Sequence, residues 1–187
     1  MRHQGARLAR GRRRVFREGA SRRRIGVLRL LYPGLTVEGR VSVAAGCDIQ
    51  VLEGGQLILR DCFVSRGVTL VAGRGAVLDV AAGIIGPHST LVARESVVVG
   101  RGSKIAEGVV VRDADHDHRK PLEDGVFITA PIDIGRDVWL AAGTTVLSGV
   151  TIGDGATIGA GAVVTSSIPA GVTAVGIPAR PLAPRIV

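Results

Sequence analysis

The sequence predicts a single all-β domain folded as a parallel β-helix, and three observations carry this prediction. Aliphatic residues recur every six positions, without a miss, from Ile134 to Val164. Trp and Tyr occur once each and Phe three times, so the core must be built from Val, Ile, Leu and Ala. Glycine occurs 27 times and proline 8 times, which supplies the tight turns that short coils require.

The period of six defines the repeating unit. It differs from the helical period of 3.6 and is a multiple of the strand period of two, so each unit fits a short strand followed by a turn. Three units close a triangular coil of about 18 residues, and stacked aliphatic side chains fill a prism too narrow for aromatic rings. Successive coils pair as parallel strands about 4.8 Å apart, which predicts about six coils between residues 51 and 170.

The predicted stack is less regular in its upstream half. There the expected inward-facing positions are separated by eight, six and six residues in turn. They are 51, 59, 65, 71, 79, 85, 91, 99, 105 and 111. Ser65 and Asp79 interrupt the aliphatic series at two of these positions. This pattern predicts a 20-residue coil with a two-residue bulge on one side.

The stack is broken once, between Val111 and Ile134, where 23 residues replace the usual 18 or 20. We therefore expect a loop excursion over 112–131. It holds two of the four histidines, His116 and His118, beside five carboxylates, which are Asp113, Asp115, Asp117, Glu123 and Asp124. With an ordinary pKa of about 6.5, a histidine is the natural general base at neutral pH.

Three motifs extend the argument beyond the period. They are Ile134-Gly-Arg-Asp-Val-Trp139, Gly159-Ala-Gly-Ala-Val-Val-Thr165 and Val175-Gly-Ile-Pro-Ala-Arg180. With them, residues 35–182 resemble the hexapeptide-repeat acyltransferases, nearest to sugar and polysaccharide O-acetyltransferases of the maltose, galactoside and colanic acid acetyltransferase type. The resemblance implies a left-handed β-helix, a homotrimer and an acyl-coenzyme A donor. The helical N-terminal segment of the maltose and galactoside enzymes is not recognisable, which favours a surface-polysaccharide acceptor.

The resemblance implies transfer of an acetyl group from acetyl-CoA to a hydroxyl of a sugar or surface-polysaccharide precursor, with no metal required. We expect direct attack of the hydroxyl on the thioester, without an acyl-enzyme, and a backbone N–H that holds the oxyanion. His116 matches the family's catalytic histidine and is the expected general base. His118 is the alternative base, and Glu95, one coil below, is the candidate that orients His116. In an extended segment Asp117 faces away from both histidines.

The donor side rests on five residues. Trp139 precedes an inward leucine, so the strand pleat points it outward. The resemblance places Trp139 beside the coenzyme at a subunit boundary, and a trimer-interface anchor is its alternative role. Backbone groups at Ala142 and Ala160 match positions that bind the pantetheine arm. Thr165 and Arg180 match residues near the nucleotide and its phosphates, although the serines after Thr165 replace a family Lys-Asp pair, so one phosphate-binding cation is missing.

The sequence offers candidate residues for the acceptor site and leaves two alternative functions. The family's acceptor-binding asparagine falls at Gly86, and His88, two residues on, is the candidate contact that replaces it. One alternative function is a gamma carbonic anhydrase-like trimer, with zinc bound by His88, His116 and His118. Another is a non-catalytic structural β-helix subunit.

Charge is concentrated in an N-terminal arm over 1–34. The net charge is +8, yet residues 1–30 hold 11 arginines and one acid, Glu18, so the remainder is slightly acidic. Ile25, Leu28 and Leu31 recur at helical spacing before a proline, which predicts a short helix over 21–32. Flanked by arginines, it resembles an interfacial helix, so membrane-surface contact is a hypothesis for the arm; the competing interpretation is a solvated tail or an upstream start that is not used in the cell. Nucleic-acid binding is not expected, because stacking aromatics are lacking.

The remaining expectations concern domains and location. The β-helix should cover 35–170, followed by a C-terminal extension over 171–187. No apolar run approaches the roughly 18 residues of a membrane span, and no signal-peptide pattern is present. We therefore expect a cytoplasmic protein, and contact of its arm with the inner face of the membrane is an added hypothesis. Cys47 and Cys62 are expected to act as small buried hydrophobes.

Overall fold

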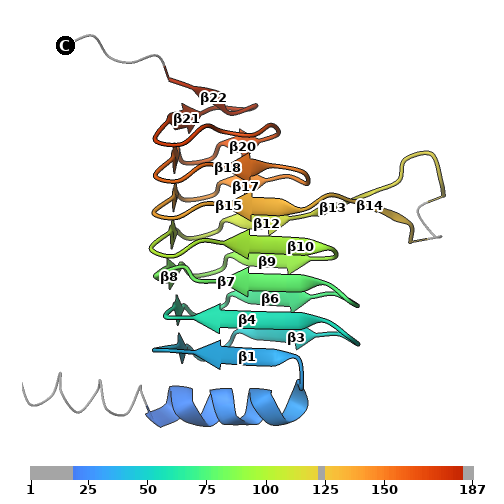
Figure 1. Ribbon diagram of the computed structural model, residues 1–187, viewed down its shortest axis with the longest axis vertical. Helices are drawn as coiled ribbons and strands as arrows, with labels where there is room; N and C mark the ends of the chain where they lie inside the picture. Colours follow the sequence, from blue (N-terminus) through green and yellow to red (C-terminus); the bar gives the residue numbers. More distant parts are fainter. Residues whose placement is uncertain (1–18, 122–124, 183–187) are drawn as a thin grey trace, which may run out of the picture.

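The chain winds into a prism of stacked triangular coils. The structure, a computed structural model, describes residues 19–121 and 125–182. After a helix over 19–31, the strands of one sheet run from right to left in front and those of another from left to right behind, while the chain ascends (Figure 1). That path is left-handed, and the predicted all-β, left-handed parallel β-helix is confirmed.

Each coil contributes one strand to each of three sheets, which form the faces of the prism. Sheet A contains β1 (Leu35–Glu38), β4 (Gln56–Arg60), β7 (Val77–Val80), β10 (Ser96–Val99), β15 (Ile132–Ile134) and β18 (Thr151–Ile152). Sheet B contains β2 (Ser42–Val43), β5 (Phe63–Val64), β8 (Ile84–Ile85), β11 (Lys104–Ile105), β16 (Trp139–Leu140), β19 (Thr157–Ile158), β21 (Thr173–Val175) and β22 (Arg180–Pro181). Sheet C contains β3 (Asp48–Val51), β6 (Thr69–Ala72), β9 (Thr90–Ala93), β12 (Val110–Arg112), β17 (Thr145–Val146) and β20 (Val163–Val164).

The chain passes from sheet A to B to C in every coil, so the prism has an A–B, a B–C and a C–A corner. Glycines at a six-residue interval make several of these turns. Gly143, Gly149, Gly155 and Gly161 have φ angles of 68, 76, 68 and 67°, a left-handed conformation that other residues rarely adopt. The period of six therefore reflects one turn per prism edge.

The core is a column of aliphatic side chains inside the three sheets. Its largest fully buried members are Leu57, Leu59, Leu70, Leu78, Ile85, Leu91, Ile105, Ile132, Leu140, Ile152, Ile158 and Val43. Both cysteines are free, with Cys62 buried and Cys47 half-buried. Downstream of the excursion the predicted inward positions and the observed ones coincide.

The predicted upstream register is wrong at positions 65, 71 and 79, whereas positions 59, 85, 91, 99, 105 and 111 are buried as predicted. Leu57 pairs with Leu78 and Thr69 with Thr90, a step of 21 residues rather than 20, whereas Thr90 pairs with Val110, which is the predicted step of 20. Val64 and Leu70 therefore point inward in place of residues 65 and 71.

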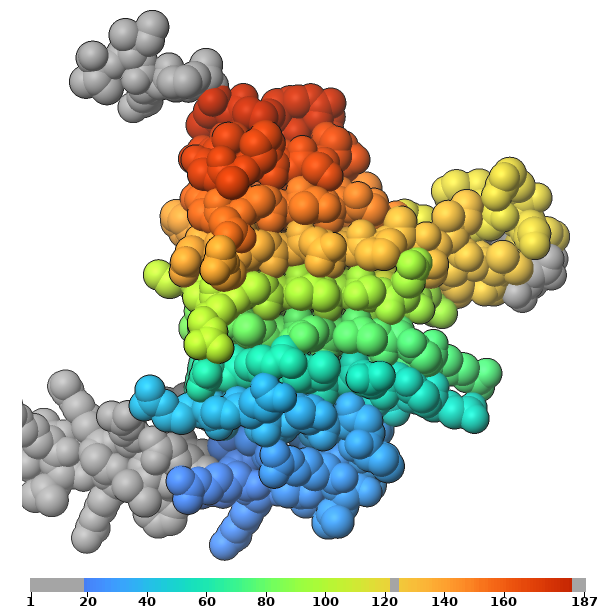
Figure 2. Space-filling view, in the orientation of Figure 1, coloured from blue at the N-terminus to red at the C-terminus, as the bar shows by residue number. Residues whose placement is uncertain are grey.

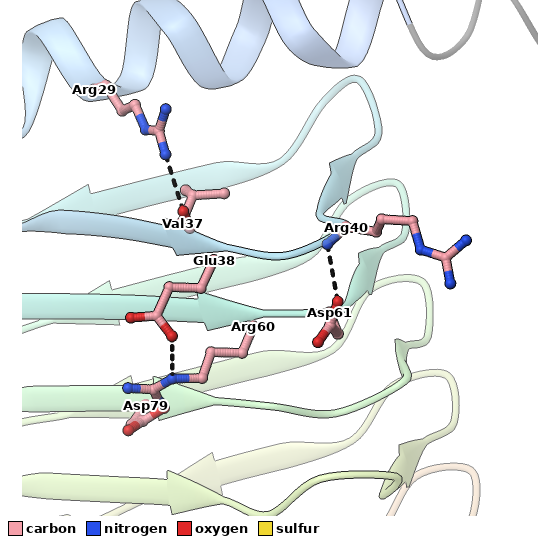
Figure 3. Close-up of polar contacts among 7 residues, drawn as sticks. All are labelled: Arg29, Val37, Glu38, Arg40, Arg60, Asp61 and Asp79. Carbon is pink, nitrogen blue, oxygen red and sulfur yellow. Dashed lines mark hydrogen bonds and ion pairs between the residues drawn. The ribbon is translucent and has the colours of Figure 1, made fainter.

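Asp79 is not a defect in the core, because it lies on the outer face of sheet A. Its neighbours Leu78 and Val80 are fully buried, and Asp79 forms an ion pair with Arg60 (Figure 3). The Nε atom of Arg60 also lies 2.8 Å from a carboxylate oxygen of Glu38. Asp79 is thus part of a row of alternating charges, Glu38, Arg60 and Asp79, on the outer surface of sheet A.

The two ends of the prism are closed differently. At the upper end β22 pairs antiparallel with β21. At the lower end the helix over 19–31 lies across the first coil (Figure 2). No helix among residues 19–121 and 125–182 has both the length and the apolar character needed to cross a bilayer.

Candidate active site

The excursion is a two-stranded hairpin that projects from the C–A corner. Its strands are β13 (Ala114–His116) and β14 (Phe127–Thr129), which pair antiparallel with His116 opposite Phe127. The chain leaves β12 of sheet C, forms the hairpin and returns as β15 of sheet A, so the hairpin replaces a corner turn (Figure 1).

Asp113 anchors the root of this hairpin to the coil below. Its side chain is fully buried and accepts hydrogen bonds from three consecutive backbone N–H groups, those of Arg94 at 2.7 Å and of Glu95 and Ser96 at 2.8 Å. On the other side, Asp115 accepts a hydrogen bond of 2.8 Å from the hydroxyl of Ser148 in the coil above. The strand before His116 is therefore held between two coils.

His116 is exposed, and its ring packs on one neighbour across the hairpin. Its centroid lies 4.3 Å from that of Phe127, with the planes tilted by 38°. The guanidinium of Arg94 lies 3.6 Å from the same Phe127 centroid, a cation–π distance. This packing restrains the imidazole while leaving it accessible to an incoming hydroxyl.

A cavity of about 340 Å³ lies beside Arg94, on the outer side of sheet C. It is lined by Leu52, Val71, Gly73, Arg74, Val92, Ala93 and Arg94. Because Arg94 contacts Phe127 and Phe127 contacts His116, this cavity is connected to the histidine by a chain of side-chain contacts. Its two guanidinium groups favour an anionic ligand group.

The other residues proposed around the histidine have different surroundings. Glu95 is exposed, and its recorded hydrogen bonds are made by its backbone, with its N–H donating to Asp113 and its carbonyl accepting from Val77. His118 is exposed beyond the end of β13. Asp117 is buried and accepts hydrogen bonds from Nε of Arg119 at 2.8 Å and from the Arg119 backbone at 3.1 Å.

The contact with Arg119 makes the hairpin sensitive to acid. These hydrogen bonds hold the pKa of the Asp117 carboxyl below its ordinary value. The stabilisation is therefore complete above the unfolded-state pKa of about 3.9 and is lost as pH falls through the lower folded-state pKa. We expect the protection of the hairpin amides from hydrogen exchange, corrected for intrinsic rates, to decrease when the pH is lowered below about 4. This decrease should be absent in Asp117→Asn. Identical profiles for both proteins would contradict the assignment.

Trp139, Ala142 and Ala160, three of the proposed donor residues, lie on the side of the prism away from the C–A corner. Trp139 lies on the outer face of sheet B with 51% of its surface exposed, so its outward direction agrees with the sequence pattern. Ala142 and Ala160 are stacked at the adjoining B–C corner, where the N–H of Gly161 donates to the Ala142 carbonyl at 2.8 Å. Small side chains leave the wall of this corner open to close approach.

Gly86 and His88 lie at the same B–C corner, in a lower coil. A β-carbon at Gly86 would overlap the backbone carbonyl of Ala106, so this position accepts no asparagine and offers no side-chain contact. His88 is exposed, has a φ of 59° and places its ring against Gly67. Gly86 and His88 therefore lie in a lower coil than His116 and at a different corner of the prism.

One chain does not bring the two halves of the proposed site together. His116 projects from the C–A corner, whereas Trp139 lies on sheet B, the face opposite that corner. Thr165 follows β20 towards the C–A corner, and Arg180 lies on β22, with a guanidinium N–H donating to the carbonyl of Ala179 at 2.9 Å. Within the described ranges, no three potential metal ligands gather.

The class of protein follows from this geometry: it is a left-handed β-helix of hexapeptide repeats with a histidine-bearing hairpin. Residues 131–166 match the family described as Bacterial transferase hexapeptide (six repeats). The match falls on the unbroken hexapeptides and confirms the predicted repeats.

Comparisons with particular proteins extend the likeness. Nodulation protein L from Rhizobium leguminosarum bv. viciae is 46% identical over 86 residues, 46% of this chain and 45% of that protein. A variant of AntD, an N-acyltransferase from Bacillus cereus, in complex with dTDP-4-amino-4,6-dideoxyglucose and coenzyme A, superposes with a TM-score of 0.66 at 18% identity, over 80% of this chain and 84% of that chain. Galactoside acetyltransferase in complex with coenzyme A superposes with a TM-score of 0.52 at 24% identity, over 86% of this chain and 68% of that chain. The matches span less than half the length of the curated relatives.

Proposed function

We propose that the protein transfers an acetyl group from acetyl-CoA to a hydroxyl of a sugar or surface-polysaccharide precursor. The observation that carries the proposal is an exposed histidine, His116, held by Phe127 on a hairpin that is anchored in a hexapeptide prism. The similar AntD and galactoside acetyltransferase were crystallised with coenzyme A, which supports the donor class. AntD also held a sugar nucleotide, which supports a sugar acceptor.

His116 would act as the general base. As the acceptor oxygen attacks the thioester carbonyl, its proton passes to an imidazole nitrogen of His116. The tetrahedral intermediate then collapses, the carbon–sulfur bond breaks, and the coenzyme A sulfur takes the proton from the imidazolium. The products are an acetyl ester and free coenzyme A, and no acyl-enzyme forms.

The separation of the two half-sites supports a homotrimer. A second copy that places its sheet B against the C–A corner of the first brings its Trp139 to the first copy's His116. Each chain carries both halves on different sides, so the contact is heterologous, and a rotation of about 120° between copies would close it into a ring of three. We therefore propose that the coenzyme binds between neighbouring subunits, with Trp139, Ala142, Ala160, Thr165 and Arg180 on the donor side.

Calorimetric titration of acetyl-CoA into the full chain tests the donor site without a known acceptor. We expect saturable binding that is about tenfold weaker in Trp139→Ala, because the ring offers a large apolar surface to the ligand. Phe63→Ala is the matched control, since Phe63 is also an exposed aromatic side chain on sheet B. Absence of binding to a folded oligomer would refute the proposed donor.

A further inference from the structure

The helix over 19–31 is fixed on the lower end of the prism in one orientation. The hydroxyl of Ser21 accepts a hydrogen bond of 2.9 Å from the Val43 backbone, and Nε of Arg24 donates to the Val43 carbonyl at 3.0 Å. Arg29 donates to the carbonyl of Val37 at 3.0 Å (Figure 3). Ile25 is buried in the core. The opposite side of the helix must therefore face away from the protein.

That outward side is apolar. Leu30 exposes 86% of its surface, Leu31 63% and Val27 55%. The spacing of three and four residues places them on one side of a helix. Holding large apolar side chains in water is unfavourable, and such a patch on a protein surface usually marks a contact site.

Arginines lie among and beside these apolar side chains, and Arg23, four residues before Val27, is on the same side of the helix. Arg22 and Arg23 are exposed on the helix, and a cavity of about 580 Å³ is lined in part by Arg22, Arg29 and Arg40. In the part of the chain that the structure describes, no carboxylate forms an ion pair with these four arginines. Figure 3 shows the guanidinium of Arg40 extending away from the coils.

We propose that this end of the prism binds the surface of a bilayer that contains anionic phospholipid. The apolar side chains would enter the boundary between headgroups and acyl chains, while the arginines would contact lipid phosphates, as interfacial amphipathic helices do. The preceding residues 1–18 add seven arginines and a single acid, Glu18, which strengthens the charge complementarity. The helix would lie on the membrane and hold the prism above it.

Vesicle flotation of the full chain tests this proposal. Wild type should float with vesicles of phosphatidylglycerol and phosphatidylcholine and remain at the bottom of the gradient with phosphatidylcholine alone. The double variant Leu30→Ser/Leu31→Ser should bind the anionic vesicles at least about tenfold more weakly, because two exposed leucines can no longer be buried. Ile177→Ser/Leu182→Ser is the matched control, because those residues are 76% and 53% exposed and lie near the other end of the prism.

Three outcomes would overturn the proposal. The first is no flotation of wild type with anionic vesicles. The second is equal flotation and equal oligomer size for wild type and Leu30→Ser/Leu31→Ser, which would assign lipid binding to the basic segment before the helix. The third is a smaller oligomer for that variant in sedimentation velocity with unchanged lipid binding, which would assign the apolar side to a second copy of the chain. Circular dichroism of each variant verifies that it is folded.

Discussion

Replacement of His116 by alanine should lower kcat for acetyl transfer by about 10²- to 10⁴-fold, the usual contribution of a general base. The acceptor hydroxyl would have to attack without losing its proton to a positioned group. The affinity for acetyl-CoA should change little, because His116 stands on the hairpin and none of the proposed donor residues does. Steady-state kinetics beside calorimetric titration measures both quantities on the same protein.

His118→Ala is the matched comparison, since His118 is an exposed histidine two residues further on. The packing of His116 against Phe127 predicts that only the His116 variant loses turnover. Normal turnover in His116→Ala together with loss in His118→Ala would move the base to His118. Loss of donor binding in His116→Ala would instead show a structural role for the ring.

The fold was predictable because the hexapeptide coil has a period that the sequence repeats almost without variation. From Ile134 to Val164 each corner uses the same turn, and inward positions can be counted. Upstream the counting fails at residues 65, 71 and 79, because the lowest coils have steps of 21 or 22 residues and carry longer strands such as β4 and β7. In a strand with buried neighbours on both sides, Asp79 cannot be placed inward or outward by period alone, and its partner Arg60 is 19 residues away.

The site was predictable in part. The break after Val111 located the hairpin, and residue type and position predicted His116 as the base, which stays a prediction. The contacts that hold the histidine were not, because each joins segments that are distant in sequence. Arg94 and Phe127 are 33 residues apart and come together only when the coils stack. Asp113 offered one signal, its place directly after the last strand of sheet C before the hairpin, but its three backbone partners carry no sequence pattern.

Those partners make Asp113 the residue with the largest expected structural effect. Asp113→Ala should lower the free energy of unfolding by about 3 kcal/mol, because three backbone N–H groups would lose a buried, charged acceptor that water could replace only partly. The hairpin would also lose its attachment to the coil of Arg94, so kcat should fall even though Asp113 is not proposed to touch the substrate. Urea denaturation and steady-state kinetics measure the two losses.

Asp115→Ala is the control, because Asp115 is exposed and makes one hydrogen bond, to Ser148. Its loss should change stability by no more than about 0.5 kcal/mol. Equal stability of the two alanine variants would contradict the anchoring role of Asp113. Asp113→Ala could also lose activity while its prism still unfolds at the wild-type urea concentration. In that case the buried carboxylate positions His116, and the prism is stable without it. The hairpin would then be a separate cooperative unit, held by its root to a scaffold that folds independently of it.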